Sequence, residues 1–594
     1  MIVPMKKVSL VVLDRYREEA LLNLRKQGLV HIKYINPPSS STIDLLEKQI
    51  QDIEKALLIT AQYPLSEKQE KHIDKKDFLS LATQIISWDQ QKQNCLQEKQ
   101  DTENKISWYQ DWGEFSVSRL KELSEQGIYI RLYKCSKKEL ATLSKTSAVE
   151  VIKRHGRIYH IAVISLGDDQ EKISLTEAFP PDRDLYILKK ELKATEDRIA
   201  SLDNLLTEMA SYRRTFLNCL AEHNKSLIFN KVKSGMQEAG EISCLQGFMP
   251  AVEVVKLVNL ANRQGWAYFI QEPDNPQEVP TLIKNPRWLR IIEPVFKFMG
   301  TLPGYNELDI SFHFLLFFSL FFALLIGDAG YGLVFLIVTY LIRKKVSTVP
   351  AEPFMLMYVL STATIIWGAL TGTWFGLERI GQVPIFNYLI IDRIDSFVAD
   401  NQVFLMYLCF LIGVIQLSIA HGIVALRQIN RLTAFSQVGW IGIIWSLFFF
   451  IGKLILNRPL PEYFAWLLIG GMSLVILFSA SQRNFLKGIG ISLVNLPLKL
   501  ISSFADILSY LRLFVIGYVT VMVAANFNAL ATELGKRGFL GIVTAALIIL
   551  FGHSLNVALG LLSVLVHGIR LNMLEFSGHL EMQWSGIEYK PFKE

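Results

Sequence analysis

Apolar runs of bilayer length fill the chain from about Asp309 onward, and they limit its fold more than any other feature. A helix that crosses a bilayer needs about 20 apolar residues. Before Asp309, by contrast, Lys, Glu, Arg and Asp recur at short intervals, as in segments that face water. The 594 residues, 51% of them hydrophobic, therefore combine two regimes that meet near 305–309. We predict a cytosolic domain at 1–305 and a transmembrane domain at 306–594.

Eight segments are candidates for membrane helices, the first two short and the last two long enough to be strongly tilted or bent. They are 311–326, 329–342, 354–375, 403–426, 434–456, 463–480, 498–530 and 539–576. Between the first two lies the motif IGDAGYG (Ile326 to Gly332), which holds three glycines and Asp328. Asp328 could cap a helix at a break here, so these residues leave open whether 311–342 forms one long helix or a hairpin.

The distribution of lysine and arginine favours the hairpin, because cytosolic loops carry an excess of positive charge. With eight helices and a cytosolic N-terminus, ten basic residues fall inside and five outside, whereas seven helices would invert this bias after the first span. Those inside are Arg343, Lys344, Lys345, Arg427, Arg431, Arg483, Lys487, Lys499, Lys590 and Lys593, and those outside are Arg379, Arg393, Arg458, Lys536 and Arg537. The only apolar run near the start, Val8 to Leu13, is too short for a signal peptide. We therefore predict that both termini are cytosolic.

Residues 1–305 are predicted to form two small α/β lobes joined by long antiparallel helices. A βαβ pattern covers 8–35, and strand patterns at 128–133 and 157–165 predict the second lobe. Helical periodicity over 42–112, with an interruption near Pro64, and over 184–228 predicts two long helices that pair as a coiled coil. Segments 247–250 and 266–270 would return the chain to the first lobe. The predicted fold class is mainly α, a dumbbell with α/β lobes followed by a polytopic helical membrane domain. A coiled-coil adaptor without a mechanical role is the alternative for this half.

Several function classes are disfavoured. The net charge of +6 is small, and the basic residues are interspersed with acidic ones, which argues against nucleic-acid binding. Neither GxxxxGK nor GxGxxG occurs, so we expect no nucleotide hydrolysis by this chain. The five cysteines form no CxxC pair, which argues against a disulfide framework and a structural zinc site. We expect no metal and no cofactor.

Two arginines lie inside apolar segments, where an arginine costs about 3 kcal/mol on insertion scales. Arg512 lies in LSYLRLFVIGY, one turn after Ser509, and Arg570 lies in SVLVHGIRLNMLEF. Polar or small residues recur before Arg570 at steps of four and three, which places them on one face of an α-helix. They are Asn556, Gly560, Ser563 and His567. Each arginine could instead extend to a lipid headgroup or pair with Asp506 or Glu575. His567 is either a proton-relay group or a packing histidine, and His421 receives no role.

These residues resemble a known family, subunit a of V-type ATPases, which is called subunit I in the A/V-type enzymes of bacteria and archaea. The resemblance rests on IGDAGYG, WGALTGTWFG (Trp367 to Gly376), SYLRL (Ser509 to Leu513) and GHSLNVALGLLSVLVHGIRLNMLEF (Gly552 to Phe576). It covers essentially the whole chain, whose length is similar to that of the compact prokaryotic form. Asp506 departs from the eukaryotic members, which carry His upstream of SYLRL.

The resemblance implies a membrane stator that faces a rotor ring of proteolipid subunits (c or K), each with one ion-carrying carboxylate. Arg512 and Arg570 match the family's arginines in the seventh and eighth helices and would separate two offset half-channels, one open to each side. Asp506, Ser563, His567 and Glu575 would line these half-channels. The ion, H⁺ or Na⁺, is not fixed by this chain, because the ring carboxylate belongs to another.

The resemblance also implies partners and a location. The soluble half would bind peripheral-stalk subunits of the E/G type and a ring-capping subunit of the d/C type, and the rest would lie in the lipid of a prokaryotic cell membrane. ATP chemistry would occur on partner subunits. A secondary transporter with a cytosolic regulatory domain is the competing hypothesis, and it predicts paired broken helices in two pseudo-symmetric halves. A purely structural scaffold would need no buried charge.

Overall fold

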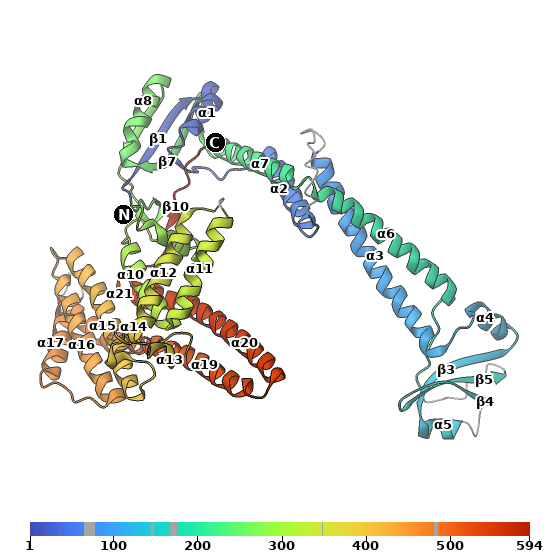
Figure 1. Cartoon of the computed structure of the whole chain (residues 1–594). Helices are drawn as coiled ribbons and strands as arrows, with labels where there is room; N and C mark the ends of the chain where they lie inside the picture. Colours follow the sequence, from blue (N-terminus) through green and yellow to red (C-terminus); the bar gives the residue numbers. More distant parts are fainter. Residues whose placement is uncertain (65–77, 144–147, 167–174, 347–348, 480–484) are drawn as a thin grey trace. The chain divides into compact units, whose positions relative to one another are not determined.

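The computed structural model describes the chain except residues 65–77, 144–147, 167–174, 347–348 and 480–484. The described residues divide into two compact units. One comprises 1–9, 28–31 and 247–592, and the other comprises 10–27, 32–246 and 593–594. The helices and strands are labelled in Figure 1. The predicted domain boundary between 305 and 306 stays a prediction.

Four long helices dominate the second unit. They are α2 (Ser41–Thr60), α3 (Phe78–Trp112), α6 (Leu185–Ala210) and α7 (Arg213–Ser234). Helix α3 packs along α6, and α2 packs along α7 (Figure 1). The first pair is antiparallel, because Phe78 at the start of α3 shares a core with Leu206 near the end of α6, whereas Tyr109 at the other end contacts Leu188. The predicted pairing is confirmed, with a break at 211–212 between α6 and α7. Part of the predicted helix 42–112 lies outside the described residues.

A three-stranded antiparallel sheet follows α3, as the strand patterns predicted. Its strands are β3 (Ile128–Ser136), β4 (Ala148–His155) and β5 (Ile158–Leu166), in the order β3-β5-β4. The short helices α4 (Val117–Glu125) and α5 (Lys137–Leu143) flank β3 in sequence. Buried Tyr133, Cys135, Ile161 and Val163 form its core.

A second sheet joins segments that are far apart in the sequence. Its path is β2-β7-β1-β8, with β6 paired to β7. The strands are β1 (Met5–Leu13), β2 (His31–Lys33), β6 (Gln237–Ala239), β7 (Ile242–Pro250) and β8 (Ala267–Gln271), and the helices α1 (Arg17–Gln27) and α8 (Val254–Gln264) connect them. The predicted βαβ unit and the return of 247–250 and 266–270 to it are confirmed.

Residues after 580 run back over this region of the first unit. Strand β10 (Ile587–Glu588) pairs in parallel with β9 (Pro280–Thr281), which precedes the short helix α9 (Glu293–Met299). Beyond β10, the Tyr589 hydroxyl donates to the Leu29 carbonyl at 2.6 Å, and the Phe592 N–H donates to the Val30 carbonyl at 2.8 Å. Phe592 is 4% exposed, so this tail is packed rather than free.

Apolar helices make up the rest of the first unit. They are α10 (Ser311–Ile326), α11 (Ala329–Lys345), α12 (Ala351–Leu370), α15 (Gln402–Arg427), α16 (Thr433–Leu456), α17 (Phe464–Phe478), α18 (Phe485–Ser509), α19 (Leu511–Gly535) and α20 (Phe539–Ser563), with the short α13 (Glu378–Gly381) and α14 (Pro384–Asn387) after α12. Among the described residues, five helical segments are long and apolar enough to cross a membrane, or six if the bent pair α10–α11 counts as one span. The predicted number of eight stays a prediction. The two longest segments are 487–535, which is interrupted at Tyr510, and 539–579.

The break between α10 and α11 turns the chain by 119°. Asp328, which is fully buried, caps α11 by accepting from the N–H groups of Gly330 and Tyr331, and it also accepts from those of Phe375 and Gly376 at 2.8 and 2.9 Å. The motifs IGDAGYG and WGALTGTWFG therefore meet at one carboxylate. A Cβ on Gly368 would lie 2.1 Å from the Ala329 nitrogen, so only glycine allows this approach.

Candidate functional site

Arg512 and His567 come together from adjacent helices. Arg512 is the second residue of α19, directly after an interruption at Tyr510, and its Nη1 lies 3.2 Å from Nδ1 of His567. The helix that continues α20 has π-helical geometry at Val564–Gly568, where His567 lies. Single π turns inside α-helices occur frequently at functional sites. Ser509 ends α18 and donates to the carbonyl of Ala505 in its own helix.

Arg570 pairs with Glu575 at a second π-helical stretch, Leu571–Phe576. Arg570 Nε lies 3.6 Å from Glu575 Oε1, and the side chains are 51% and 3% exposed, respectively. A π turn brings residues i and i+5 together, which explains a pair five residues apart. Oε2 of Glu575 is buried without a hydrogen-bond partner among the described residues. Arg570 thus extends from a buried carboxylate to the outer surface of the helix.

Asp506 begins a chain of hydrogen bonds that passes through two histidines. Its Oδ2 lies 3.2 Å from Nε2 of His579, whose Nδ1 lies 2.9 Å from Nε2 of His421. Nδ1 of His421 in turn lies 2.6 Å from Oε1 of Gln437. These side chains come from α18, α21 (Ser577–His579), α15 and α16. From the sequence alone, His421 received no role and His579 was not singled out. A histidine in the apolar run 403–426 was the available signal.

A polar cavity of about 330 Å³ connects this chain with Glu575. Its polar lining is His421, Gln437, Lys499, Ser502, Ser503, Asp506, Glu575, His579 and Glu581. Two of the six predicted site residues, Asp506 and Glu575, therefore face one space. Water needs such polar partners to occupy a cavity, and the polar side chains that line this one supply them.

Buried amides fix α19 against the π-helical stretch. The hydroxyl of Tyr510 donates to Oε1 of Gln416 at 2.9 Å, and Nε2 of Gln416 donates to Oδ1 of Asn572 at 3.0 Å. Nδ2 of Asn572 donates to the carbonyl of Gly568 at 3.2 Å. This network links α15, the start of α19 and the π-helical stretch through side-chain hydrogen bonds.

Ser563 is not brought into this arrangement. Its hydroxyl donates to the carbonyl of Leu559 in the same helix, and among the residues that the structure describes no hydrogen bond joins it to either arginine. Asn556, on the same predicted face, is buried and donates to the Tyr331 hydroxyl at 3.0 Å and to the Thr520 carbonyl at 2.8 Å. The described residues contain no cluster of three His, Cys, Asp or Glu side chains suited to a metal ion.

Comparison with known proteins decides the family. No protein-family model matches the chain. The chain is 34% identical to V-type ATP synthase subunit I of Borreliella burgdorferi, over the full length of both proteins. The chain belongs to the V-type ATP synthase subunit I family. It is also 29% identical to V-type ATP synthase subunit I 1 of Treponema pallidum, again over both full lengths.

More distant members of the subunit I family include an A-type one. The A-type ATP synthase subunit I of Methanocaldococcus jannaschii is 26% identical over 70% of this chain and 64% of that protein. Among solved structures, the cytoplasmic N-terminal domain of a subunit I, described as a homologue of subunit a of V-ATPase, aligns with 45% of this chain and all of that one, at 14% identity and a TM-score of 0.24. The five apolar helical segments of bilayer length are compatible with a membrane subunit.

Proposed function

We propose that this subunit I is the non-catalytic membrane stator of a rotary V/A-type ATP synthase. Its half-channels would carry H⁺ or Na⁺ to and from the carboxylates of a rotor ring. The observation that carries this proposal is the placement of two arginines on adjacent apolar helices, one of them beside a polar cavity. Charge in such helices is costly, so it marks a functional site.

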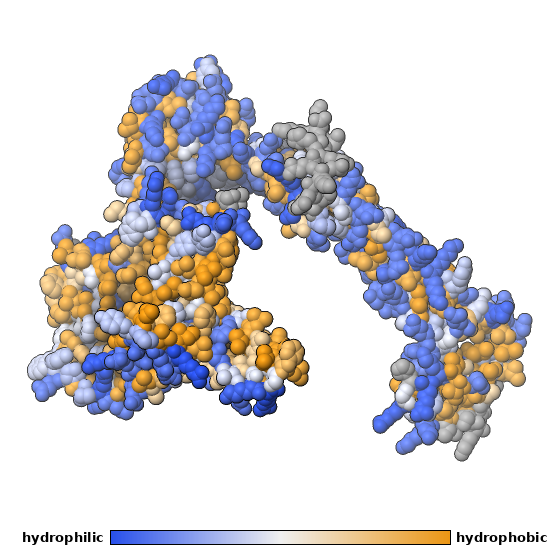
Figure 2. All heavy atoms as spheres, in the orientation of Figure 1, coloured by the Kyte–Doolittle hydropathy of each residue, from blue (hydrophilic) through white to orange (hydrophobic). Residues whose placement is uncertain are grey.

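The surface around Arg570 supports a ring partner. Apolar residues on the outward side of α20 and its continuation are exposed, namely Leu555, Leu559, Leu562, Leu565, Val566 and Leu574. Figure 2 shows hydrophobic side chains gathered over the bundle that includes α20. Arg570, half-exposed within this surface, is the cation that an arriving ring carboxylate would meet.

Electrostatics gives the arginines their role. A nearby cation lowers the pKa of a carboxylate, so a ring carboxylate that approaches Arg570 and Arg512 would release its ion. Guanidinium keeps its charge where an ammonium would lose it. Glu575, at 3.6 Å from Arg570, would balance the arginine between successive ring carboxylates. His567 would orient Arg512 by its 3.2 Å contact.

The cavity with Asp506, His421, His579 and Glu575 would be the half-channel open to the cytosol. The predicted topology supports this side, because Lys499 lines the cavity and belongs to the predicted cytosolic lysines. The arginines would block direct passage to the other half-channel, so an ion would ride the ring for almost a full turn.

The remaining partners are also part of the proposal. The paired helices α3 and α6 and their lobes would bind peripheral stalks and resist torque, and a ring-capping subunit would contact the same half. The complex would lie in a prokaryotic cell membrane, with both termini of the chain cytosolic. The competing secondary transporter requires paired broken helices, and among the described residues one bent pair, α10–α11, is found.

Affinity purification of the tagged chain in mild detergent, followed by mass spectrometry, tests this proposal. We expect a small proteolipid ring subunit together with stalk and nucleotide-binding subunits. A chain that purifies alone or as a simple homo-oligomer would instead favour the transporter.

A further inference from the structure

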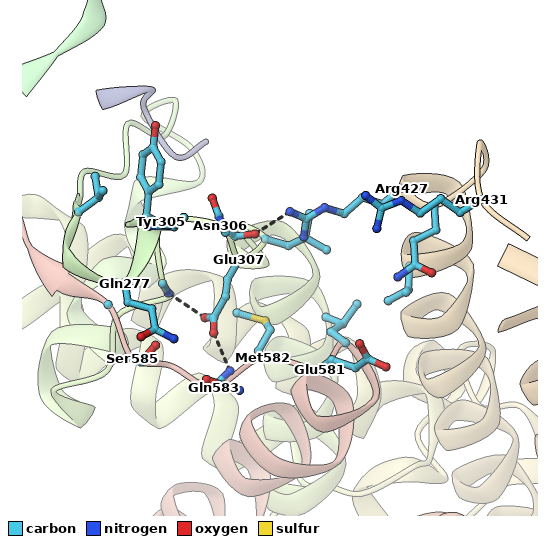
Figure 3. A pocket seen from close by; sticks show the side chains of 18 residues that line it. Gln277, Tyr305, Asn306, Glu307, Arg427, Arg431, Glu581, Met582, Gln583 and Ser585 are labelled. Atoms are coloured by element: carbon cyan, nitrogen blue, oxygen red, sulfur yellow. Dashed lines mark hydrogen bonds between the residues drawn. The ribbon is translucent and has the colours of Figure 1, made fainter. Parts of the chain in front are cut away.

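A second cavity, of about 540 Å³, opens beside the first, and Glu581 is the one residue that lines both. The larger cavity lies between the segment 276–308, the loop after α15 and the residues that follow α21. Figure 3 shows Glu581 at its edge, on the segment that also carries Met582 and Gln583 and across the cavity from Arg427 and Arg431. We propose that Glu581 is the cation-binding carboxylate of the passage from the cytosol into the cavity of Asp506 and Glu575. This inference rests on the function proposed above.

The backbone at Glu581 supports a role for its side chain. Glu581 has a φ of +60°, in the left-handed region, and follows Leu580, the residue that caps the end of α21. Its N–H donates to the Gly578 carbonyl, and the N–H of Met582 donates to the Ser577 carbonyl, which is the pattern of a helix end where glycine is the usual residue. Glycine would adopt this conformation at lower cost. A glutamate here is explained if the carboxylate is needed.

Two other charged residues that line the larger cavity, Glu307 and Arg427, have hydrogen-bond partners of their own. The Glu307 carboxylate accepts hydrogen bonds from the backbone N–H groups of Gln583 at 2.6 Å and Gly304 at 2.8 Å (Figure 3). Glu307 is therefore already engaged by the backbone. Arg427 donates to the Asn306 carbonyl at 2.6 Å. Glu581 therefore lines the larger cavity as a carboxylate that no hydrogen bond or ion pair among the described residues engages.

The charged residues that line the two cavities suggest what the Glu581 carboxylate does. The larger cavity carries Glu307, Arg427 and Arg431, and the inner cavity carries His421, Lys499, Asp506, Glu575 and His579. Two arginines in the outer space repel a cation, and a carboxylate at the passage restores an attractive potential there. Glu581 would raise the local concentration of H⁺ or Na⁺ before the ion reaches Asp506.

Ion uptake by the whole complex tests this role. In liposomes with the nucleotide-binding subunits outside, ATP-driven uptake is measured against external pH and external Na⁺ concentration. For Glu581→Gln we expect the ion concentration for half-maximal uptake to rise about threefold or more, with the maximal rate retained. Glu581→Gly, which suits the backbone, should behave in the same way, and Glu581→Asp should restore the normal concentration dependence.

Glu588→Gln is the matched control, because it removes an exposed carboxylate from the same tail outside both cavities. Unchanged concentration dependence in both Glu581→Gln and Glu581→Gly would overturn the inference. That outcome differs from failure of the proposed function, in which wild-type chain brings down no ring or Arg570→Ala still transports.

A charge-reversal experiment covers the case in which these variants assemble poorly. Glu581→Cys, in a chain without its five native cysteines, is modified after assembly with a cationic or an anionic methanethiosulfonate reagent. The cationic adduct should lower uptake at limiting ion concentration and the anionic adduct should restore it. Equal uptake with both adducts would also overturn the inference.

Discussion

Two antiparallel helix pairs differ in where they place charged side chains. Helices α3 and α6 place them in water, whereas helices α19 and α20 place them among apolar residues. The first pair keeps its ion pairs in water, as in Lys99 and Glu196 at 2.7 Å, with side chains 31% and 47% exposed. The second pair and its continuation hold Arg512, His567 and the Arg570–Glu575 pair among apolar residues. Exposed pairs contribute little to stability. Charge in the apolar pair is costly, and the proposed role in ion transport would account for its presence.

The largest expected effect is the loss of transport when a guanidinium is removed from the apolar pair. Arg512→Ala and Arg570→Ala should each lower ATP-driven ion uptake by about 100-fold or more, the scale at which one fixed charge acts within a site. Arg570→Lys should recover only part of the activity, because the compact ammonium lacks the planar fork. The complexes should still assemble.

Lys99→Ala in α3 is the control, with uptake expected to match wild type because its partner Glu196 lies in water. Normal uptake by both arginine variants, or an equal loss in the Lys99 variant, would remove the distinction between the two pairs.

Loss of a helix cap among the apolar helices should cost more stability than loss of a helix cap in water. Asp328→Ala leaves three buried N–H groups and one part-buried N–H group without their acceptor, and it should cost about 3 kcal/mol or more at the α10–α11 corner. Ser40→Ala, which removes the cap of α2, should cost about 1 kcal/mol. Hydrogen exchange of peptides covering the two helix starts compares them directly. Equal protection losses would contradict this ordering.

Removing a single hydroxyl provides a finer comparison. Tyr510→Phe takes away the donor to buried Gln416 and should destabilise the detergent-purified chain by about 1–3 kcal/mol in thermal unfolding. Tyr63→Phe removes a hydroxyl that donates to the half-exposed Asp203, and should cost less, because water can replace the lost bond. A larger loss for Tyr63→Phe would break the comparison.

The smallest effect is expected at a partly exposed ion pair in the second unit. Lys92 Nζ lies 2.6 Å from Asp203, and its hydrogen bonds to Asp203 and then Tyr63 raise the pKa of Lys92. Asp203→Asn should therefore cost less than about 1 kcal/mol.

The pH dependence of that effect has a definite sign. Because the folded pKa of Lys92 is raised, its contribution is complete below the unfolded pKa of about 10.4 and is lost as the pH rises through the folded pKa. Hydrogen exchange of α3 and α6 should show wild type and Asp203→Asn converging above that pH. If the difference in hydrogen exchange between wild type and Asp203→Asn persisted above that pH, the effect would come from packing and not from the ion pair.

The soluble pair was predictable because its apolar residues follow the α-helical period. Phe78, Ile85 and Leu206 are all buried in one core. The break at Asp328 was also predictable, since a short acidic side chain between glycines is typical of a cap. Membrane spans were found as segments, while their number depends on a bend that composition does not encode.

The sequence predicts candidate site residues but not how they are arranged in space. An α-helical period placed Ser563 on the face of Arg570, whereas the helix is π-helical from Val564 and pairs Arg570 with the residue five positions later. His421 and His579 are 158 residues apart, and only the packing of their helices brings them to 2.9 Å. No local pattern carries that information.

The tail that follows α21 also has a consequence for biosynthesis. Tyr589 bonds to Leu29, which the ribosome makes 560 residues earlier, and β10 covers β9. During translation, the backbone groups of residues 29–31 and 280–281 therefore wait without these partners until the membrane helices between them have been synthesised. The tail can therefore dock only after all of those helices have been synthesised. A chain that stops before Ile587 leaves the edge of β9 unpaired, and proteases and chaperones can recognise such an edge.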